Sequence, residues 1–263
     1  MRYGILGLVV AAAWYGVRAP EARHRGTDHQ DGRWSWSGRV TAGQTLEIRG
    51  ISGTISADPA AGEQVEVTAL KHGRDDDPAD VRIEVVEHGG GVTICAVYPG
   101  RNNRCRAGGG EMHTRDNDVE VDFTVRVPRG VRFEGANVNG DVEATNLGGP
   151  VELSTVNGGV RLETSGGEAE AHTVNGGITA VVHALGTEAL RFQTVNGAIA
   201  VSLPAALSVD LEAKTVNGTI QSDFPIQVQG RINPRELMGR IGQGGRTLEL
   251  ETVNGSIRLR RLP

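Results

Sequence analysis

Apolar and polar residues alternate along most of this chain with a period of two, and one short motif interrupts the alternation at regular intervals. Before the interruption the pattern reads, for example, Val151-x-Leu153, and after it the pattern resumes as Val160-x-Leu162. A period of two is typical of β-strands that bury one face. Each unit is therefore predicted to be a strand, a corner and a second strand.

The interrupting motif is the tripeptide Val-Asn-Gly, whose copies begin at positions 138, 156, 174, 195, 216 and 253. Their starts are 18, 18, 21, 21 and 37 residues apart, and the last interval has room for two units, one of them degenerate. A weaker seventh copy at residues 46–55 parallels residues 248–257. A recurring period of this length indicates a repeat architecture.

Two assemblies fit these units. Asn-Gly favours a type I′ hairpin turn, which would give an antiparallel meander. Alternatively, each unit is one coil of a β-solenoid, in which equivalent residues of successive coils stack about 4.8 Å apart. The constancy of the corner favours the coil, because a meander requires no equivalence between successive hairpins. We therefore predict an all-β fold, a parallel β-solenoid with coils of about 18–21 residues and Val-Asn-Gly corners.

Stacking gives the corner residues structural roles. Asparagine side chains can hydrogen-bond to those above and below as a ladder, and glycine can supply a positive φ at the corner. The residues assigned to these roles are Asn139, Asn157, Asn175, Asn196, Asn217 and Asn254, with Gly140, Gly158, Gly176, Gly197, Gly218 and Gly255.

The remaining sequence suggests one domain behind an export signal. Residues 1–19 start with Met1-Arg2 and an apolar run, which predicts a signal peptide or an uncleaved amino-terminal anchor, with a membrane tether through residues 3–17. Residues 20–44 are polar and are expected to be a linker, and residues 45–263 are expected to form the single repeat domain. The segment 233–239, Asn-Pro-Arg-Glu-Leu-Met-Gly, is predicted to form a short helix.

The chain has two cysteines, Cys95 and Cys105, which bracket a Pro-Gly turn. In an exported protein such a pair predicts one disulfide, and the alternative is two free buried thiols. The spacing does not fit a zinc site, since two sulfurs without nearby paired histidines cannot fill four positions.

Stacked coils would also align a row of acidic side chains four residues before each motif. The row contains Glu134, Glu152, Glu170, Glu212 and Glu249, with Arg191 interrupting it. Adjacent carboxylates about 5 Å apart could hold Ca²⁺ or meet a basic partner, whereas the simpler interpretation is a solvated strand face. A second group, Arg101, Arg104, Arg106 and Arg115, surrounds the expected disulfide loop and could bind an anionic glycan or phosphate.

Composition narrows the remaining function classes. Of 263 residues, 38 are Gly and only 10 are aromatic, which argues against a helical bundle and against stacking platforms for sugars or bases. The net charge of −5 leaves no overall basic field for nucleic acid. There is no Gly-x-Ser-x-Gly elbow, no cofactor motif and no unique acid–base cluster, so we expect neither an enzyme nor a cofactor.

The repeats resemble a bacterial family of exported β-strand-repeat domains of unknown function that are catalogued as candidate adhesins. The resemblance covers about residues 46–261 and rests on three features. These are the Thr-Val-Asn-Gly-x-Ile/Val units, Val125-x-Val127-Pro128-x-Gly130 before the first of them, and Gly239-x-Ile241-Gly242-x-Gly244-Gly245 before the last. It implies a β-helix-like fold at the cell envelope and brings no catalytic residues.

The expected function is a non-enzymatic exported envelope protein, an adhesin-like binding or scaffold module at the periplasm or cell surface. The alternative is a partner-binding regulatory component of an envelope stress or signalling system, and a polysaccharide-active β-helix enzyme is the third hypothesis. The expected partner is an envelope protein or a glycan.

Overall fold

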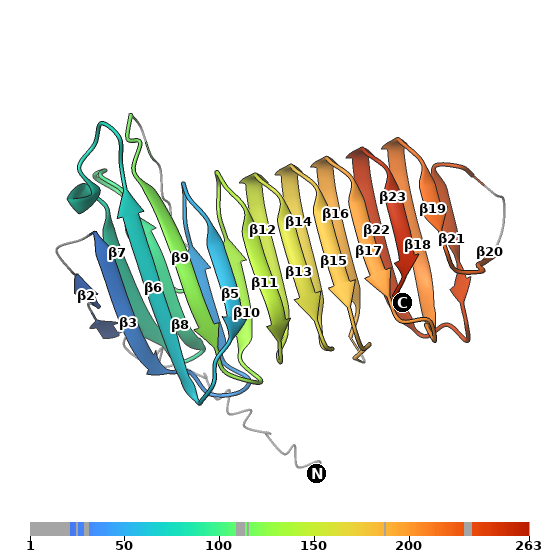
Figure 1. Ribbon diagram of the computed structural model, residues 1–263, viewed down its shortest axis with the longest axis horizontal. Helices are drawn as coiled ribbons and strands as arrows, with labels where there is room; N and C mark the ends of the chain where they lie inside the picture. The colour runs from blue at the N-terminus through green and yellow to red at the C-terminus, as the bar shows by residue number, and fades with distance from the viewer. Residues whose placement is uncertain are drawn as a thin grey trace, which may run out of the picture.

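The computed structural model describes residues 22–24, 26–28, 32–108, 114, 116–186, 188–228 and 233–262. It consists of two facing sheets that together form an elongated stack, with the amino-terminal strands at one end (Figure 1). The predicted export signal at residues 1–19 lies outside the described residues. Within the part that is described, no helix has the length and apolar character needed to span a membrane.

In both sheets the spatial order of the strands differs from the sequence order at both ends. Sheet A has twelve strands in the order β1 (Ala22–His24), β7 (Arg82–His88), β8 (Gly91–Val97), β4 (Thr45–Arg49), β10 (Arg132–Ala136), β12 (Val151–Asn157), β14 (Ala169–Asn175), β16 (Leu190–Asn196), β22 (Arg246–Asn254), β18 (Val209–Asn217), β21 (Glu236–Ile241), β20 (Gln227–Val228). Sheet B has eleven in the order β19 (Ile220–Ser222), β23 (Ile257–Arg261), β17 (Ile199–Leu203), β15 (Ile178–Val182), β13 (Val160–Thr164), β11 (Val142–Leu147), β5 (Ile55–Pro59), β9 (Glu120–Val127), β6 (Gln64–His72), β3 (Arg33–Arg39), β2 (Thr27–Asp28). A short 3₁₀ helix, η1 (Pro78–Asp80), precedes β7.

The predicted coils are confirmed. Each Val-Asn-Gly corner joins a strand of sheet A to a strand of sheet B, and equivalent strands of neighbouring coils pair in parallel, as in β12 with β14 and β13 with β15. The weak copy near the start is a true coil, because β4 and β5 pair in parallel with β10 and β11. The antiparallel meander is therefore wrong for the repeats.

The core lies between the two sheets and follows from the alternation. In β12 and β13 the inward residues, such as Leu153 and Leu162, are fully buried, and the residues between them are partly or fully exposed. Most of the buried aromatic residues, Trp34, Tyr98, Phe123 and Phe133, lie in the amino-terminal half of the stack. Small residues such as Ala171 and Ala180 are fully buried in the middle coils.

Two expectations about secondary structure near the ends of the stack are wrong. Residues 33–39 of the predicted linker form β3, which pairs antiparallel with β6 and buries Trp34. The predicted helix at 233–239 is instead a turn leading into β21: the side chain of Asn233 accepts a hydrogen bond from the Arg235 amide at 3.0 Å, and β21 then pairs with β18. Asn and Pro start turns as readily as helices, and the open edge of β18 favours a strand.

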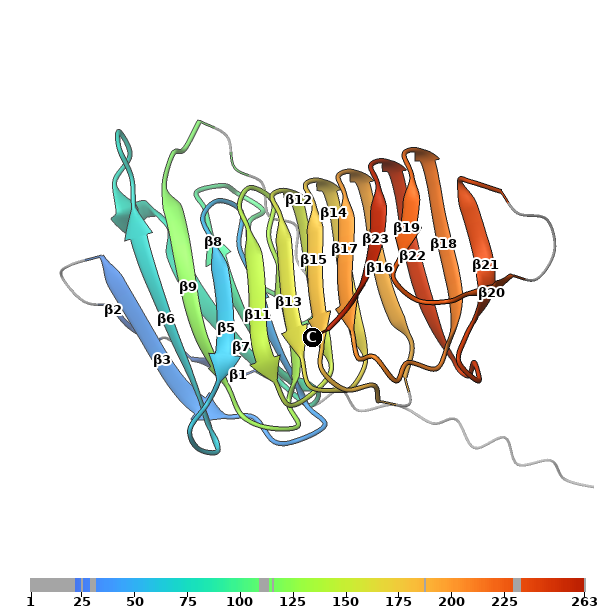
Figure 2. The ribbon, with the colours of Figure 1, turned by 45° about the vertical axis from the view of Figure 1, so that its right-hand side comes forward.

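The long interval before the last Val-Asn-Gly copy holds no second coil. It contains the short antiparallel strands β20 and β21, of which β21 covers the outer edge of β18 and β20 pairs with β21. The last coil, β22–β23, then lies between β16–β17 and β18–β19, so the stacking order departs from the sequence order (Figures 1 and 2).

Candidate binding face

The corners form the predicted asparagine ladder along one edge of the stack. From the second asparagine onward, each side-chain amide donates to the side-chain oxygen of the asparagine before it in the stack over 2.7–2.9 Å. In spatial order the ladder runs Asn139, Asn157, Asn175, Asn196, Asn254, Asn217. The ladder therefore follows the spatial order of the coils, with Asn254 of the last coil between Asn196 and Asn217.

A second ladder, which the sequence analysis did not single out, lies just inside the first. The buried threonine of each Thr-Val-Asn-Gly copy donates its hydroxyl to the glycine carbonyl of the neighbouring corner over 2.8–2.9 Å; Thr173, for example, bonds Gly158. The first copy has Asn137 at this position, and its amide makes the same kind of bond to the Gly53 carbonyl at 2.7 Å. The recurrence of threonine in five of six copies was the signal for this role.

Glycine is required at the corners for a reason other than the one expected. Only Gly140 of the six has a φ in the left-handed region, at 130°. At the other five, a Cβ atom would lie 1.8–2.2 Å from the carbonyl oxygen of the adjacent corner, as at Gly176 against Gly158. The close approach of neighbouring coils, rather than a positive φ, therefore excludes other residues there.

The valines of the corners point outward and form a row beside the asparagine ladder. Their exposed fractions run from 36% to 53%. The row consists of Val138, Val156, Val174, Val195, Val216 and Val253.

The acidic row predicted for sheet A is present, with each member in register with the next. It runs Glu47, Glu134, Glu152, Glu170, Arg191, Glu249, Glu212 across seven adjacent strands. Glu47 is the member that the sequence analysis missed, although the weak repeat at residues 46–55 placed it at the equivalent position.

Arg191 divides this row into two parts with different electrostatics. Its guanidinium donates to Glu249 at 2.9 Å and to Glu170 at 3.0 Å, and Lys214 pairs with Glu212. The hydrogen bond from Arg191 holds the pKa of Glu249 below its usual range. The carboxyl-terminal part of the row is thus neutralised within the protein.

In the amino-terminal part of the row Arg49 pairs with Glu47, whereas Glu134 and Glu152 make no ion pair among the described residues. Burial raises the pKa of Glu134, and the carboxylates of Glu152 and Glu47 on either side raise it further. Glu47 is itself buried, with hydrogen bonds from the hydroxyl of Thr93 at 2.8 Å and the amide of Gly108 at 3.2 Å.

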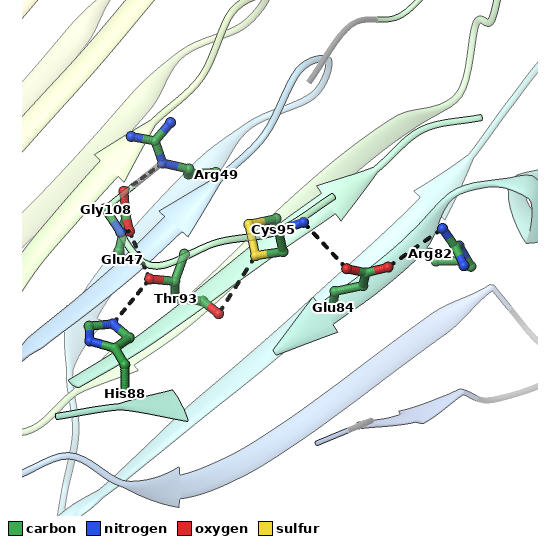
Figure 3. The surroundings of a disulfide bond; sticks show 9 residues. Glu47, Arg49, Arg82, Glu84, His88, Thr93, Cys95 and Gly108 are labelled. Carbon is green, nitrogen blue, oxygen red and sulfur yellow. Dashed lines mark hydrogen bonds and ion pairs between the residues drawn. A yellow bond between two sulfur atoms is a disulfide. The ribbon is translucent and has the colours of Figure 1, made fainter. Parts of the chain in front are cut away.

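The segment at Gly108 that contacts Glu47 follows shortly after Cys105, and the predicted disulfide between Cys95 and Cys105 is present. Figure 3 shows the disulfide between Glu84 on one side and Thr93 with Glu47 on the other. The Cys105 amide donates to Glu84 at 3.3 Å, which fixes the loop against β7. Arg101, Arg104 and Arg106 of the loop are exposed, and Arg115 lies outside the described residues.

The calcium hypothesis for Glu134, Glu152, Glu170, Glu212 and Glu249 stays a prediction. Among the described residues, no group of three or more His, Cys, Asp or Glu side chains is arranged to hold a metal ion. Two of the five carboxylates are engaged by Arg191 and a third by Lys214. The geometry accordingly favours an open row of charged side chains over a closed cation-binding site.

A two-sheet stack of parallel coils with laddered corners defines a class of β-solenoid-like repeat proteins. The chain belongs to the Toastrack DUF4097 family, whose sequence model matches residues 35–260. No curated protein sequence matches the chain.

Solved structures from three bacteria match the chain. A candidate cell adhesion protein from Clostridium sporogenes superposes with a TM-score of 0.52 at 11% identity, covering 87% of this chain and 99% of the other, which supports the fold. Candidate adhesins from Bacteroides fragilis (TM-score 0.34, 11% identity, 88% and 97% coverage) and Parabacteroides merdae (0.27, 10%, 88% and 97%) also match, at scores too low to support a structural argument.

Proposed function

We propose that this protein is a non-enzymatic, exported binding module of the cell envelope, adhesin-like in character, that presents the outer face of sheet A to a partner. The observation that carries the proposal is the pair of ladders at the corners. Because asparagine and threonine bonds join every coil to its neighbour, the outward side chains of sheet A are held in straight rows at strand spacing. A rigid row loses little conformational freedom when a partner binds.

The charge of the face suggests the chemistry of the partner. Glu134, Glu152 and Glu170 lie on consecutive strands, and no cation separates the first two. Such a row favours a cationic partner, for example a basic protein segment, since complementary charge speeds encounter and fixes register. The resemblance of the fold to candidate adhesins agrees with a binding role.

Export is supported by the disulfide, since bonds of this kind persist in oxidising compartments. Mass spectrometry of the mature protein will locate its first residue and decide between a cleaved signal and a retained anchor. Protease treatment of intact cells and of spheroplasts separates a surface location from a periplasmic one. Full protection in both preparations would contradict export.

The binding proposal is tested with beads that carry the purified protein. Retention is measured on three surfaces: intact cells of the source bacterium, isolated cell-wall sacculi, and the envelope protein fraction. We expect retention that falls at high salt and is lost in the variant with Glu134, Glu152 and Glu170 all changed to Gln. A matched variant of sheet B, Glu143→Gln with Glu163→Gln, should retain binding. Wild-type beads that bind no better than albumin beads on all three surfaces would contradict the proposal.

The non-enzymatic part is tested separately. Incubation with a panel of bacterial and host polysaccharides, read out as new reducing ends or unsaturated sugars, should give no product. Cleavage of any polymer would establish the enzyme hypothesis instead.

A further inference from the structure

The last coil of the chain occupies an internal position in the stack. Strand β22 pairs in parallel with β16 on one side and with β18 on the other, and β23 is likewise enclosed by β17 and β19. The coil is made last in sequence, yet it separates two coils that are consecutive in sequence. It therefore fills a slot whose two walls already exist without it.

The walls of this slot accept a coil of the same repeat. Asn254 bonds Asn196 on one wall and receives the Asn217 amide from the other. The Thr252 hydroxyl bonds the Gly197 carbonyl, and the Gly255 carbonyl accepts from Thr215. Any occupant must supply asparagine, threonine and glycine at these positions, and residues 246–261 of another copy of this chain supply all of them.

A glycine-rich connection leads into the slot. Strand β21 lies on the outer edge of β18 and β22 on its inner edge, so residues 242–245 cross the end of β18. Gly242, Gly244 and Gly245 have φ values of 62°, 74° and 131°. The crossing is held by two amide hydrogen bonds of 3.2 Å, from Gln243 to the Ser208 hydroxyl and from Gly245 to Asp210. Short connections of this kind are where domain exchange starts.

The slot can also close when it is empty. The connection between β17 and β18 has five residues, 204–208, which lies within the range of the connections between coils that stack directly: three (148–150), four (165–168) and seven (183–189). Direct stacking of β18 on β16 would place Glu212 beside Arg191, which would replace the partner lost with Glu249. The open molecule thus keeps a complete stack while the coil is outside.

A coil outside the slot cannot remain in water unprotected. Its inward residues Leu248, Leu250, Ile257 and Leu259 are at most 1% exposed in the structure. They need a cover that also satisfies the strand edges and the two ladders. The same slot in a second molecule provides that cover.

We propose that residues 246–261 exchange between two copies of this chain, so that each copy inserts its last coil into the slot of the other. The result is a symmetric dimer in which every contact of the monomer is kept and only the crossing at residues 242–245 changes. This inference does not depend on the proposed function.

The test uses two full-length variants that each carry one new cysteine. Gln193 on β16 and Glu251 on β22 are register neighbours on the outer face, 3.5 Å apart between side-chain atoms. One protein carries Gln193→Cys, and a second protein of different mass carries Glu251→Cys. They are mixed at increasing concentration in mild denaturant, returned to buffer and oxidised. The native cysteines are already bonded and buried.

We expect a disulfide-linked heterodimer whose yield rises with protein concentration and whose link maps to positions 193 and 251. The matched control replaces the second protein by His172→Cys, which lies in the same row of sheet A but outside the exchanging coil. A heterodimer yield no higher than that of the control at any concentration would overturn the proposal.

A single chain with both Gln193→Cys and Glu251→Cys supplies the second measurement. We expect it to close an internal disulfide and, once closed, to form no dimer. Failure of the internal link would show that β22 does not lie beside β16 and would also overturn the proposal.

Discussion

The middle of the stack and its carboxyl-terminal end are built from the same repeat but are ordered differently. From β10–β11 to β16–β17 each coil stacks on the one before it, with equivalent residues in register. At the end, the final coil enters between two others. The comparison shows that the repeat determines how two coils stack, whereas it does not determine which two coils are neighbours.

The reason for the difference lies in what covers the last edge. Strand β21 pairs with the outer edge of β18 and β20 pairs with β21, so sheet A ends in short antiparallel strands rather than in an open repeat strand. Open edges of repeat strands invite pairing with other chains. In the sequence, β20 and β21 precede β22, so the strands at that edge come before the coil that lies between β16–β17 and β18–β19.

The largest expected effect is that of replacing a corner glycine, and it should differ between the middle of the stack and the carboxyl-terminal end. In the middle, Gly176→Ala puts a Cβ 1.9 Å from the Gly158 carbonyl oxygen, and the two coils cannot part because the chain links them on both sides. We expect a loss of about 3 kcal/mol in the free energy of unfolding, measured in urea. A loss below about 1 kcal/mol would show that the corners are not closely packed.

Gly255→Ala creates a similar clash, 1.8 Å from the Gly197 carbonyl oxygen, but in a coil that can leave. We expect a smaller loss of stability together with closure of the slot. Closure is detected with Gln193→Cys and Lys214→Cys in the same chain, because β22 separates these positions in the present structure. Equal losses for both glycine variants and no new disulfide would contradict closure.

The buried threonines test the same comparison with a smaller change. Thr173→Val removes the hydroxyl that donates to the Gly158 carbonyl at 2.9 Å and is expected to lower stability by about 1–2 kcal/mol. Thr252→Val removes the equivalent bond to Gly197. Urea unfolding of both variants should show a smaller loss at Thr252, and a larger loss there would argue that the last coil is held as firmly as the middle ones.

The two parts of the acidic row should respond to pH in opposite directions. Because the pKa of Glu134 is raised, the favourable contribution of its protonated form is present at acid pH and is lost as the pH rises through that pKa. Glu134→Gln should therefore increase the free energy of unfolding at neutral pH by about 0.5 kcal/mol, which is measured as a higher melting temperature. In acid the substitution should have little effect.

Glu249 has a lowered pKa, so its contribution is present above the ordinary glutamate pKa and is lost as the pH falls through the lowered value. Glu249→Gln should accordingly lower the melting temperature at neutral pH and lose its effect in acid. Melting curves of both variants across the acid range check the signs. The same sign for both at neutral pH would contradict the division of the row by Arg191.

The smallest effect expected is that of Ca²⁺. If the carboxylates hold the ion, millimolar Ca²⁺ raises the melting temperature of the wild type, and Glu152→Gln with Glu170→Gln abolishes the shift. The part of the row near Glu134 should account for most of it, since Arg191 already engages Glu170 and Glu249. A melting temperature that does not depend on Ca²⁺ would contradict the calcium hypothesis.

At the amino-terminal end the sequence contained signals for a strand and for a further member of the acidic row, but they were too weak to be assigned. Residues 33–39 alternate tryptophan with serine, which is a strand signal, yet their polarity suggested a linker. Burial of Trp34 against the core makes this segment a strand. Glu47 likewise occupies the row position that its repeat indicated, but it is contacted by the segment after Cys105, through the Gly108 amide, and no local pattern places that segment there.

The repeat by itself favoured parallel coils over a meander and, for stacked coils, determined the asparagine ladder and the acidic row, because identical units that pair in register must align equivalent side chains. The disulfide was also predicted from the two cysteines and confirmed. Only the tertiary structure decided the position of the last coil, the strand β21 in place of a helix, and the role of the corner glycines. These depend on which edges are open and on how closely neighbouring backbones approach, and both properties arise only when distant segments are brought together.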